Sequence, residues 1–192
     1  RFPAAVDDAL AAFRWAAANA STLGADPSRV AVAGDSAGGN LATVVAQSLR
    51  GTLAHPLALQ LLIYPVTDLR FSAASYQNYA HGYGLTAEAM RYFRDTYVRN
   101  PADIQDTRAS PLLALDLSGM PPALVLTAGF DPLRDEGAAY ADALSVAGNP
   151  TQYVCFERQI HGFIIMGGAV DEANTAVHLC ADFLRARFAD TA

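Results

Sequence analysis

Ser36 lies at the centre of a pentapeptide, Gly34-Asp35-Ser36-Ala37-Gly38, that matches the pattern G-x-S-x-G. A short β-branched segment precedes it and a helical pattern follows, so we expect the serine on a sharp turn between a strand and a helix. Such a turn projects the hydroxyl, and glycines two residues away on either side prevent collisions. The helix that begins after Ser36 directs free N–H groups and a positive dipole toward it, so the N–H of Ala37 is the expected oxyanion donor. The pattern therefore predicts a nucleophilic serine.

Two other interpretations of this segment are an ordinary glycine-rich turn and a phosphate-binding loop. The second lacks support, because the chain has no GxxxxGK[ST] motif and no lysine. The nucleophile interpretation requires a base and an orienting carboxylate elsewhere in the chain.

Four histidines compete for the role of the base. His55 precedes a predicted strand, His178 lies within the last helical pattern, and His81 falls in an irregular region where a surface position is expected. His161 follows the last predicted strand by a short loop, and reactive groups in parallel sheets gather at the carboxyl ends of the strands. His161 is therefore the predicted base for Ser36.

The orienting carboxylate is also expected after a strand. Asp131 follows one, and Pro132 disfavours helical geometry at Asp131 and keeps it in the loop between strand and helix. Asp135 and Glu136 are expected to serve the first turn of the next helix, where acidic groups suit the helix dipole. Asp68, at the end of the preceding strand, is the alternative to Asp131.

The elements that would position these side chains alternate along the chain. Apolar spacing predicts helices over 6–17, 37–50, 135–147 and 171–188, and strands over 29–33, 58–64, 123–127 and 152–156. In the last helix we expect Ala173, Val177, Cys180 and Leu184 to face inward. The alternation predicts an α/β fold, a mostly parallel sheet with helices on both faces. We expect residues 1–192 to form one domain, with 69–120 as an irregular, lid-like insertion that contains a helix capped by Thr86.

Composition excludes several classes of protein. A chain with 52% hydrophobic and 17% charged residues is not disordered, and 192 residues can bury a sizeable core. Thirteen arginines against nineteen acidic residues, a net charge of −6, argue against nucleic-acid binding. The longest apolar run, residues 57–66, is too short to span a bilayer. No Cys/His cluster suggests a metal, and the two cysteines do not make a disulfide framework. A cytoplasmic location is expected, although a chain that begins with Arg1 has an uninformative N-terminus.

Five segments together resemble the hormone-sensitive-lipase family of α/β-hydrolase esterases, particularly its bacterial members. They are Phe2–Asp8, Gly34–Asn40, Pro121–Ala123, Asp131–Gly137 and His161–Phe163. The resemblance implies an α/β-hydrolase fold and hydrolysis of carboxylic esters, usually with short to medium acyl chains, without a cofactor. It also implies that Ser36, Asp131 and His161, in the chain order typical of this superfamily, form a catalytic triad.

The resemblance has one departure. The family carries a His-Gly-Gly-Gly motif upstream of the serine that completes the oxyanion hole, and no such motif occurs among the 35 residues before Ser36. The chain resembles the C-terminal two-thirds of a family member and lacks its N-terminal third. Ala37 would then be the sole oxyanion donor, and the strand 29–33 would be an open edge. We expect either association with the missing segment or a homodimer.

The expected partner is a small-molecule ester, with Asp35, Phe130 and Phe163 as candidate contacts to the substrate. The triad residues do not distinguish esters from amides, carbamates or lactones. A different class of function also stays open, a disabled fragment or a binding protein on the same scaffold, because the His-Gly-Gly-Gly motif is absent.

Overall fold

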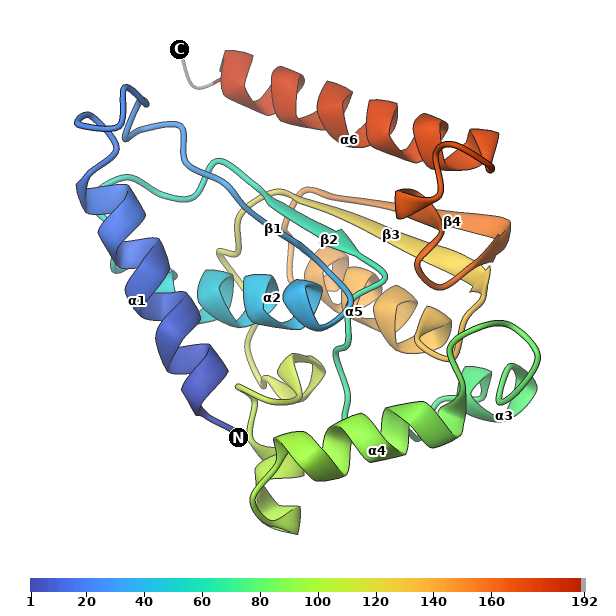
Figure 1. The fold of residues 1–192 in the computed structure, drawn as a ribbon. Coiled ribbons are helices and arrows are strands. Elements are labelled where there is room, and N and C mark those ends of the chain that lie inside the picture. Colours follow the sequence, from blue (N-terminus) through green and yellow to red (C-terminus); the bar gives the residue numbers. More distant parts are fainter. Residues whose placement is uncertain (191–192) are drawn as a thin grey trace.

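The computed structural model of the protein describes residues 1–190, in which helices and strands alternate (Figure 1). The strands are β1 (Val32–Asp35), β2 (Gln60–Ile63), β3 (Ala123–Phe130) and β4 (Thr151–Ile160). The α-helices are α1 (Ala4–Ala18), α2 (Ala37–Leu49), α3 (Ser75–Asn78), α4 (Ala87–Tyr97), α5 (Arg134–Val146) and α6 (Asp171–Asp190). Short 3₁₀ helices occur at η1 (Pro101–Gln105), η2 (Pro111–Leu113) and η3 (Phe163–Ile165).

The described strands form one parallel sheet in the order β1-β2-β3-β4. Gln60 of β2 pairs with Val32 on one side and with Ala123 on the other, so the central strands are in close register. A helix lies in each connection between neighbouring strands. The predicted α/β class with a parallel sheet is confirmed, and the carboxyl ends of all these strands meet at one rim.

Helices cover both faces of the sheet, as the sequence predicts. In Figure 1, α6 lies over one face, and α2 and α5 lie against the other. Successive residues of β2 serve the two layers: Leu61 packs in the cluster with α6, and Leu62 packs in the cluster with α2 and α5. Because side chains alternate along a strand and both faces are buried, the apolar run in β2 is continuous.

The position of β1 differs from the prediction over 29–33. The carboxylate of Asp26 accepts hydrogen bonds from Ser28 and from the Arg29 side chain, and these hold the start of the predicted segment in a turn. The ladder with β2 begins only at Val32 and continues to Asp35. The strand therefore ends directly before Ser36, and in the described chain it forms one edge of the sheet.

The strands β3 and β4 are longer than predicted. The second half of β4 contains charged and polar residues at 157–159, so it lacks the apolar pattern from which a strand is predicted. These residues are tolerated because β4 lies at the other edge of the sheet, with both of its faces partly accessible. A Cβ atom at Gly129 would lie 1.9 Å from the carbonyl oxygen of Glu157, so only glycine permits this close approach of the two strands. The pairing shifts there, between Ala128 and Phe130.

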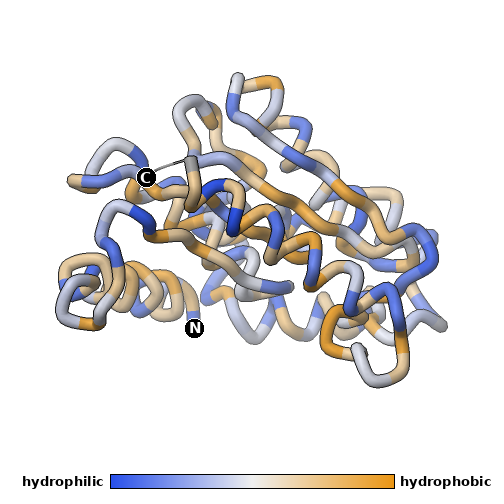
Figure 2. The backbone as a smooth tube through the Cα atoms, turned by 90° about the horizontal axis from the view of Figure 1, so that it is seen from above, coloured by the Kyte–Doolittle hydropathy of each residue, from blue (hydrophilic) through white to orange (hydrophobic). Residues whose placement is uncertain are grey.

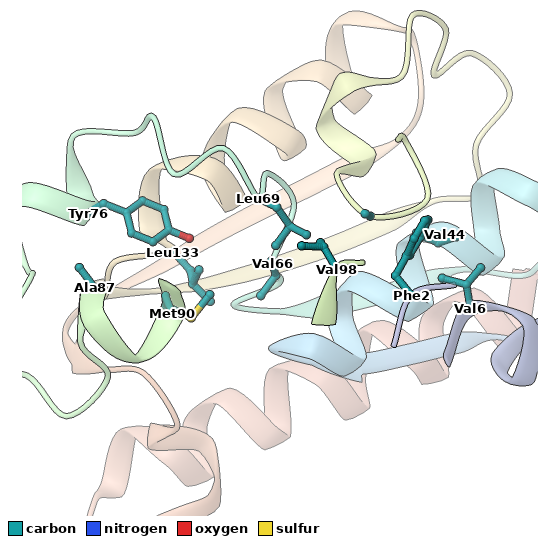
Figure 3. Packing of buried hydrophobic residues seen from close by; sticks show 11 residues of the cluster. Phe2, Val6, Val44, Val66, Leu69, Tyr76, Ala87, Met90, Val98 and Leu133 are labelled. Atoms are coloured by element: carbon teal, nitrogen blue, oxygen red, sulfur yellow. The ribbon is translucent and has the colours of Figure 1, made fainter. Parts of the chain in front are cut away.

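The segment 69–120 contains α3, α4, η1 and η2 and adds no strand to the sheet. Thr86 caps α4, as expected, since its side chain accepts a hydrogen bond from the N–H of Ala89. The segment packs onto the body through a cluster of buried apolar side chains that also includes the N-terminus, where the N–H of Phe2 donates to the carbonyl of Tyr97. Figure 3 shows Val98 and Leu69 in the middle of this cluster.

One residue of α6 is placed differently from the prediction. Ala173 and Cys180 are buried and Leu184 packs against the same cluster, but Val177 is 49% exposed. Ala176, one residue earlier, takes the inward position. Hydrophobic and hydrophilic residues are interleaved along this helix (Figure 2). Apolar residues therefore also lie outside its buried face, and spacing alone does not identify which of them are buried.

Candidate active site

Ser36 occupies the turn between β1 and α2 with a strained, positive-φ backbone conformation, φ 52° and ψ −117°. A Cβ atom at Gly34 would lie 2.2 Å from the carbonyl oxygen of Gly38, so the first glycine of the motif is required. The expectation of crowding at Gly38 itself is wrong, because a Cβ atom there meets only ordinary contacts. The second crowded position is Gly39, where a Cβ atom would lie 2.9 Å from Pro65.

His161 and Asp131 lie at the carboxyl ends of β4 and β3, the positions predicted from the sequence. The Nε2 atom of His161 is 2.9 Å from the Oγ atom of Ser36, and its Nδ1 atom is 2.7 Å from Oδ2 of Asp131. Asp131 is fully buried, and its other carboxylate oxygen accepts a hydrogen bond from the N–H of Leu133. Because an ionised carboxylate only accepts, the proton of the imidazole belongs on Nδ1, which leaves Nε2 free to accept from Ser36.

The alternatives weighed for these roles lie elsewhere. His55, His81 and His178 are exposed. The carboxylate of Asp68 is buried, but it forms a bidentate ion pair with Arg70 and also accepts from the backbone N–H of that residue.

The backbone around Ser36 is fixed from several directions. Its carbonyl accepts hydrogen bonds from the N–H groups of Val66 and Asn40, and its own N–H donates to the carbonyl of Ile63. The buried side-chain amide of Asn40 donates to the carbonyls of Val66 and Ala109, which ties the first turn of α2 to two loops. These bonds explain how a strained turn persists at this position.

Ala37 is the first residue of α2 and lies beside Ser36 on the wall of a cavity of about 580 Å³. N–H groups in the first turn of a helix have no partner within the helix, so the N–H of Ala37 is left without a partner in α2. Apart from Ser36, His161 and a few polar groups, the cavity is lined by apolar side chains. These include Leu41, Val66, Leu69, Met90, Phe93 and Tyr97.

The three candidate substrate contacts do not line this cavity. Phe163 is fully buried and packs against Tyr64 and Phe156, so it belongs to the core beneath α6. The ring of Phe130 stacks on Tyr83. Asp35 is exposed on the edge strand. The motif neighbours of Asp131 and His161 thus serve packing, because adjacent residues on a strand or loop point in different directions.

Glu136, expected only in the first turn of α5, has a second role. It is 2% exposed, and its Oε1 atom accepts hydrogen bonds from the N–H groups of Thr67 and Asp68. Burial raises the pKa of Glu136 to about 8. The side chain thereby joins the helix that follows Asp131 to the loop that follows β2, a contact between residues almost seventy positions apart that no local pattern indicates.

Within residues 1–190, no group of three or more histidine, cysteine or acidic side chains is arranged to hold a metal ion. None of the helices described is both long enough and apolar enough to cross a bilayer.

A family model described as the α/β-hydrolase fold matches residues 1–165 of the chain. The chain belongs to this family. Its predicted membership of the hormone-sensitive-lipase branch agrees with its relatives and is confirmed. It is 44% identical over 187 residues to ethyl acetate hydrolase of Pseudomonas putida, covering 96% of this chain and 58% of that protein. It is 43% identical to carboxylesterase NlhH of Mycobacterium tuberculosis, covering 85% of this chain and 52% of that one.

Solved structures give the same result. The thermophilic carboxylesterase EstE1, cloned from a metagenomic library, superposes with a TM-score of 0.94 at 43% identity, over 98% of this chain and 65% of that one. The hyperthermophilic esterase of Pyrobaculum calidifontis superposes with a TM-score of 0.92 at 42% identity, over 97% and 62%. The chain spans between about half and two thirds of the length of these relatives.

Proposed function

We propose that the chain carries the nucleophile, base and orienting carboxylate of a carboxylic ester hydrolase. The observation that supports this most directly is the hydrogen-bonded series from Ser36 through His161 to Asp131 at one rim of the sheet. The names of the relatives, which are esterases and carboxylesterases, support esters as the substrate class.

The proposed reaction is a two-step acyl transfer. Nε2 of His161 takes the proton of the Ser36 hydroxyl as the oxygen attacks the ester carbonyl. The carboxylate of Asp131 orients the ring and stabilises its charged form, and the N–H of Ala37 donates to the tetrahedral oxyanion. His161 then protonates the departing alcohol, and water repeats the sequence on the acyl-enzyme.

The cavity beside Ser36 supports a small substrate with an apolar group. Its volume of about 580 Å³ falls within the usual range for small-molecule sites, and its walls are mainly hydrocarbon. Esters with short to medium acyl chains fit this description, and no cofactor is needed for the proposed steps.

Hydrolysis of a series of p-nitrophenyl esters tests the proposal. The chain should release p-nitrophenol with saturation kinetics, and Ser36→Ala should abolish this release. Ser21→Ala, which changes an exposed serine in the loop after α1, should hydrolyse the esters like the parent. Equal rates for Ser36→Ala and the parent would overturn the assignment of the nucleophile.

A further inference from the structure

Tyr64 directly follows β2, and its ring lies against the imidazole of His161. The two ring centroids are 4.4 Å apart and the ring planes are inclined by 52°. The side chain of Tyr64 is 1% exposed, and its backbone N–H donates to the carbonyl of Leu126 on the neighbouring strand. A firmly held aromatic ring therefore packs against the side chain that links Ser36 to Asp131.

The backbone of Tyr64 places the ring where alternation along the strand would not. Leu61 and Ile63 pack toward α6 and Leu62 packs toward α2 and α5, so an extended residue 64 would also point toward α2 and α5. Tyr64 instead has a left-handed φ of 35° and joins the cluster on the α6 side. This conformation accompanies the contact of the ring with His161.

The backbone conformation of Tyr64 indicates that its position serves more than packing. Left-handed backbone is unusual for an aromatic residue, and strained residues that persist tend to cluster at functional sites. Of the non-glycine residues described, only Ser36, Phe71 and Tyr64 have positive φ, and two of these three touch the site. The phenolic hydroxyl is buried without a hydrogen-bond partner among the described residues, as are those of Tyr76 and Tyr97, so the hydroxyl does not set Tyr64 apart.

We propose that Tyr64 is a positioning residue, whose ring holds the imidazole of His161 in the orientation that meets Ser36 and Asp131 at once. Hydrogen bonds hold the two ring nitrogens of His161, Nδ1 and Nε2. The ring of Tyr64 packs against the imidazole and restrains its tilt. An aromatic ring this close also favours the charged imidazole that forms during acyl transfer. Burial and the nearby carboxylates of Asp35 and Asp131 raise the pKa of Tyr64, so the contact is made by a neutral phenol.

The inference rests on the proposed function, and three variants test it. Tyr64→Leu removes the ring, Tyr64→Phe removes only the unpaired hydroxyl, and Phe156→Leu removes a ring that packs against Phe163 on the α6 side of the sheet. We expect Tyr64→Leu to lower kcat by about 10- to 100-fold with KM within about twofold of the parent. Tyr64→Phe should have the kcat of the parent. Phe156→Leu should be less stable than the parent but should keep its kcat.

A second readout does not require turnover. In protein labelled with ¹⁵N-histidine, the Nδ1 proton of His161, assigned with His161→Gln, should be far downfield and protected from exchange in the parent and in Tyr64→Phe. It should exchange rapidly in folded Tyr64→Leu. A Tyr64→Leu protein with parental kcat and a protected proton would overturn the inference, as would a Tyr64→Phe protein as slow as Tyr64→Leu. If the proton behaves as expected but none of the proteins hydrolyses an ester, the proposed function fails and the positioning role stands.

Discussion

The Nε2 atom of His161 lies 2.9 Å from the Oγ atom of Ser36, although 125 positions separate the two residues in the chain. The parallel order β1-β2-β3-β4 makes this possible, because the carboxyl ends of the outer strands β1 and β4 open onto the same rim as the ends of β2 and β3. Asp131, at the end of β3, and Tyr64, at the end of β2, contact His161 from two sides. Each strand of the described sheet thus contributes one side chain to the site.

Replacing Asp131 tests the orienting carboxylate against Asp68, the alternative that the sequence offered. In Asp131→Asn the side chain can donate to the imidazole, which favours the wrong tautomer, and losses of about 10⁴-fold in kcat are typical of this change in serine hydrolases. Asp68→Asn alters a carboxylate of similar burial that pairs with Arg70, so its kcat should stay near that of the parent. The kcat values of the two variants on p-nitrophenyl acetate provide the comparison, and similar losses in both would contradict the assignment.

The glycines of the serine turn offer a matched pair of substitutions. In Gly34→Ala the new methyl group would collide with the backbone of Gly38, and overpacking of this kind destabilises by roughly 1–3 kcal/mol or more. In Gly38→Ala the nearest atom is 3.8 Å away, so the free energy of unfolding should change little or rise. Urea denaturation measures both. Equal stability of the two variants would show that the turn has a different geometry.

Glu136 predicts a specific dependence of stability on pH. Its pKa is raised to about 8 in the folded protein from 4.5 in the unfolded chain, so the folded state retains a proton that the unfolded state loses. The contribution of this group is full below about pH 4.5 and is lost as the pH rises toward 8, a change on the order of a few kcal/mol. Urea denaturation at pH 5 and pH 8 measures this change. Between these pH values the free energy of unfolding should fall less in Glu136→Gln than in the parent, because the amide keeps an acceptor for Thr67 and Asp68 but does not titrate. Identical declines would contradict the raised pKa.

The wall of the cavity predicts the preference for acyl chains. Met90 is buried on the side of α4 that faces the cavity, whereas Tyr92, two residues along the same helix, is 67% exposed and lies outside it. Met90→Ala should enlarge the cavity and shift the maximum of kcat/KM in a p-nitrophenyl ester series toward longer chains. Tyr92→Ala should leave the profile unchanged. An unchanged profile in Met90→Ala would place the acyl group elsewhere.

The position of the candidate site could be predicted from the sequence because its residues follow a topological rule. Ser36, Asp131 and His161 each follow an apolar strand pattern within a few residues, and the carboxyl ends of parallel strands meet at one rim. That rule does not depend on the exact strand bounds, so the error of three residues at the start of β1 did not affect it.

The residues that the sequence did not reveal act through contacts made by the folded chain. Tyr64 reads as the last residue of a buried strand, and only its φ of 35° turns the ring toward His161. The sequence around Glu136 indicates only an acidic residue in the first turn of a helix. Its hydrogen bonds to Thr67 and Asp68 depend on the distance between α5 and the loop after β2. The Tyr64-Pro65 pair at the carboxyl end of β2 was the available signal for a break in the strand. Phe163 was misassigned because its neighbour His161 lies in the site while its own side chain faces the core.

Labelling with a fluorophosphonate tests the central claim most directly, because the reagent reacts with a serine only where a base activates the hydroxyl. The proposed function predicts one phosphonyl group per folded chain, located by peptide mass spectrometry on Ser36, and no labelling of Ser36→Ala. Labelling should also fall sharply in His161→Gln, whose glutamine cannot take up the proton. A folded protein that stays unlabelled, or that carries the phosphonyl group on another residue, would contradict the assignment of Ser36 as the nucleophile.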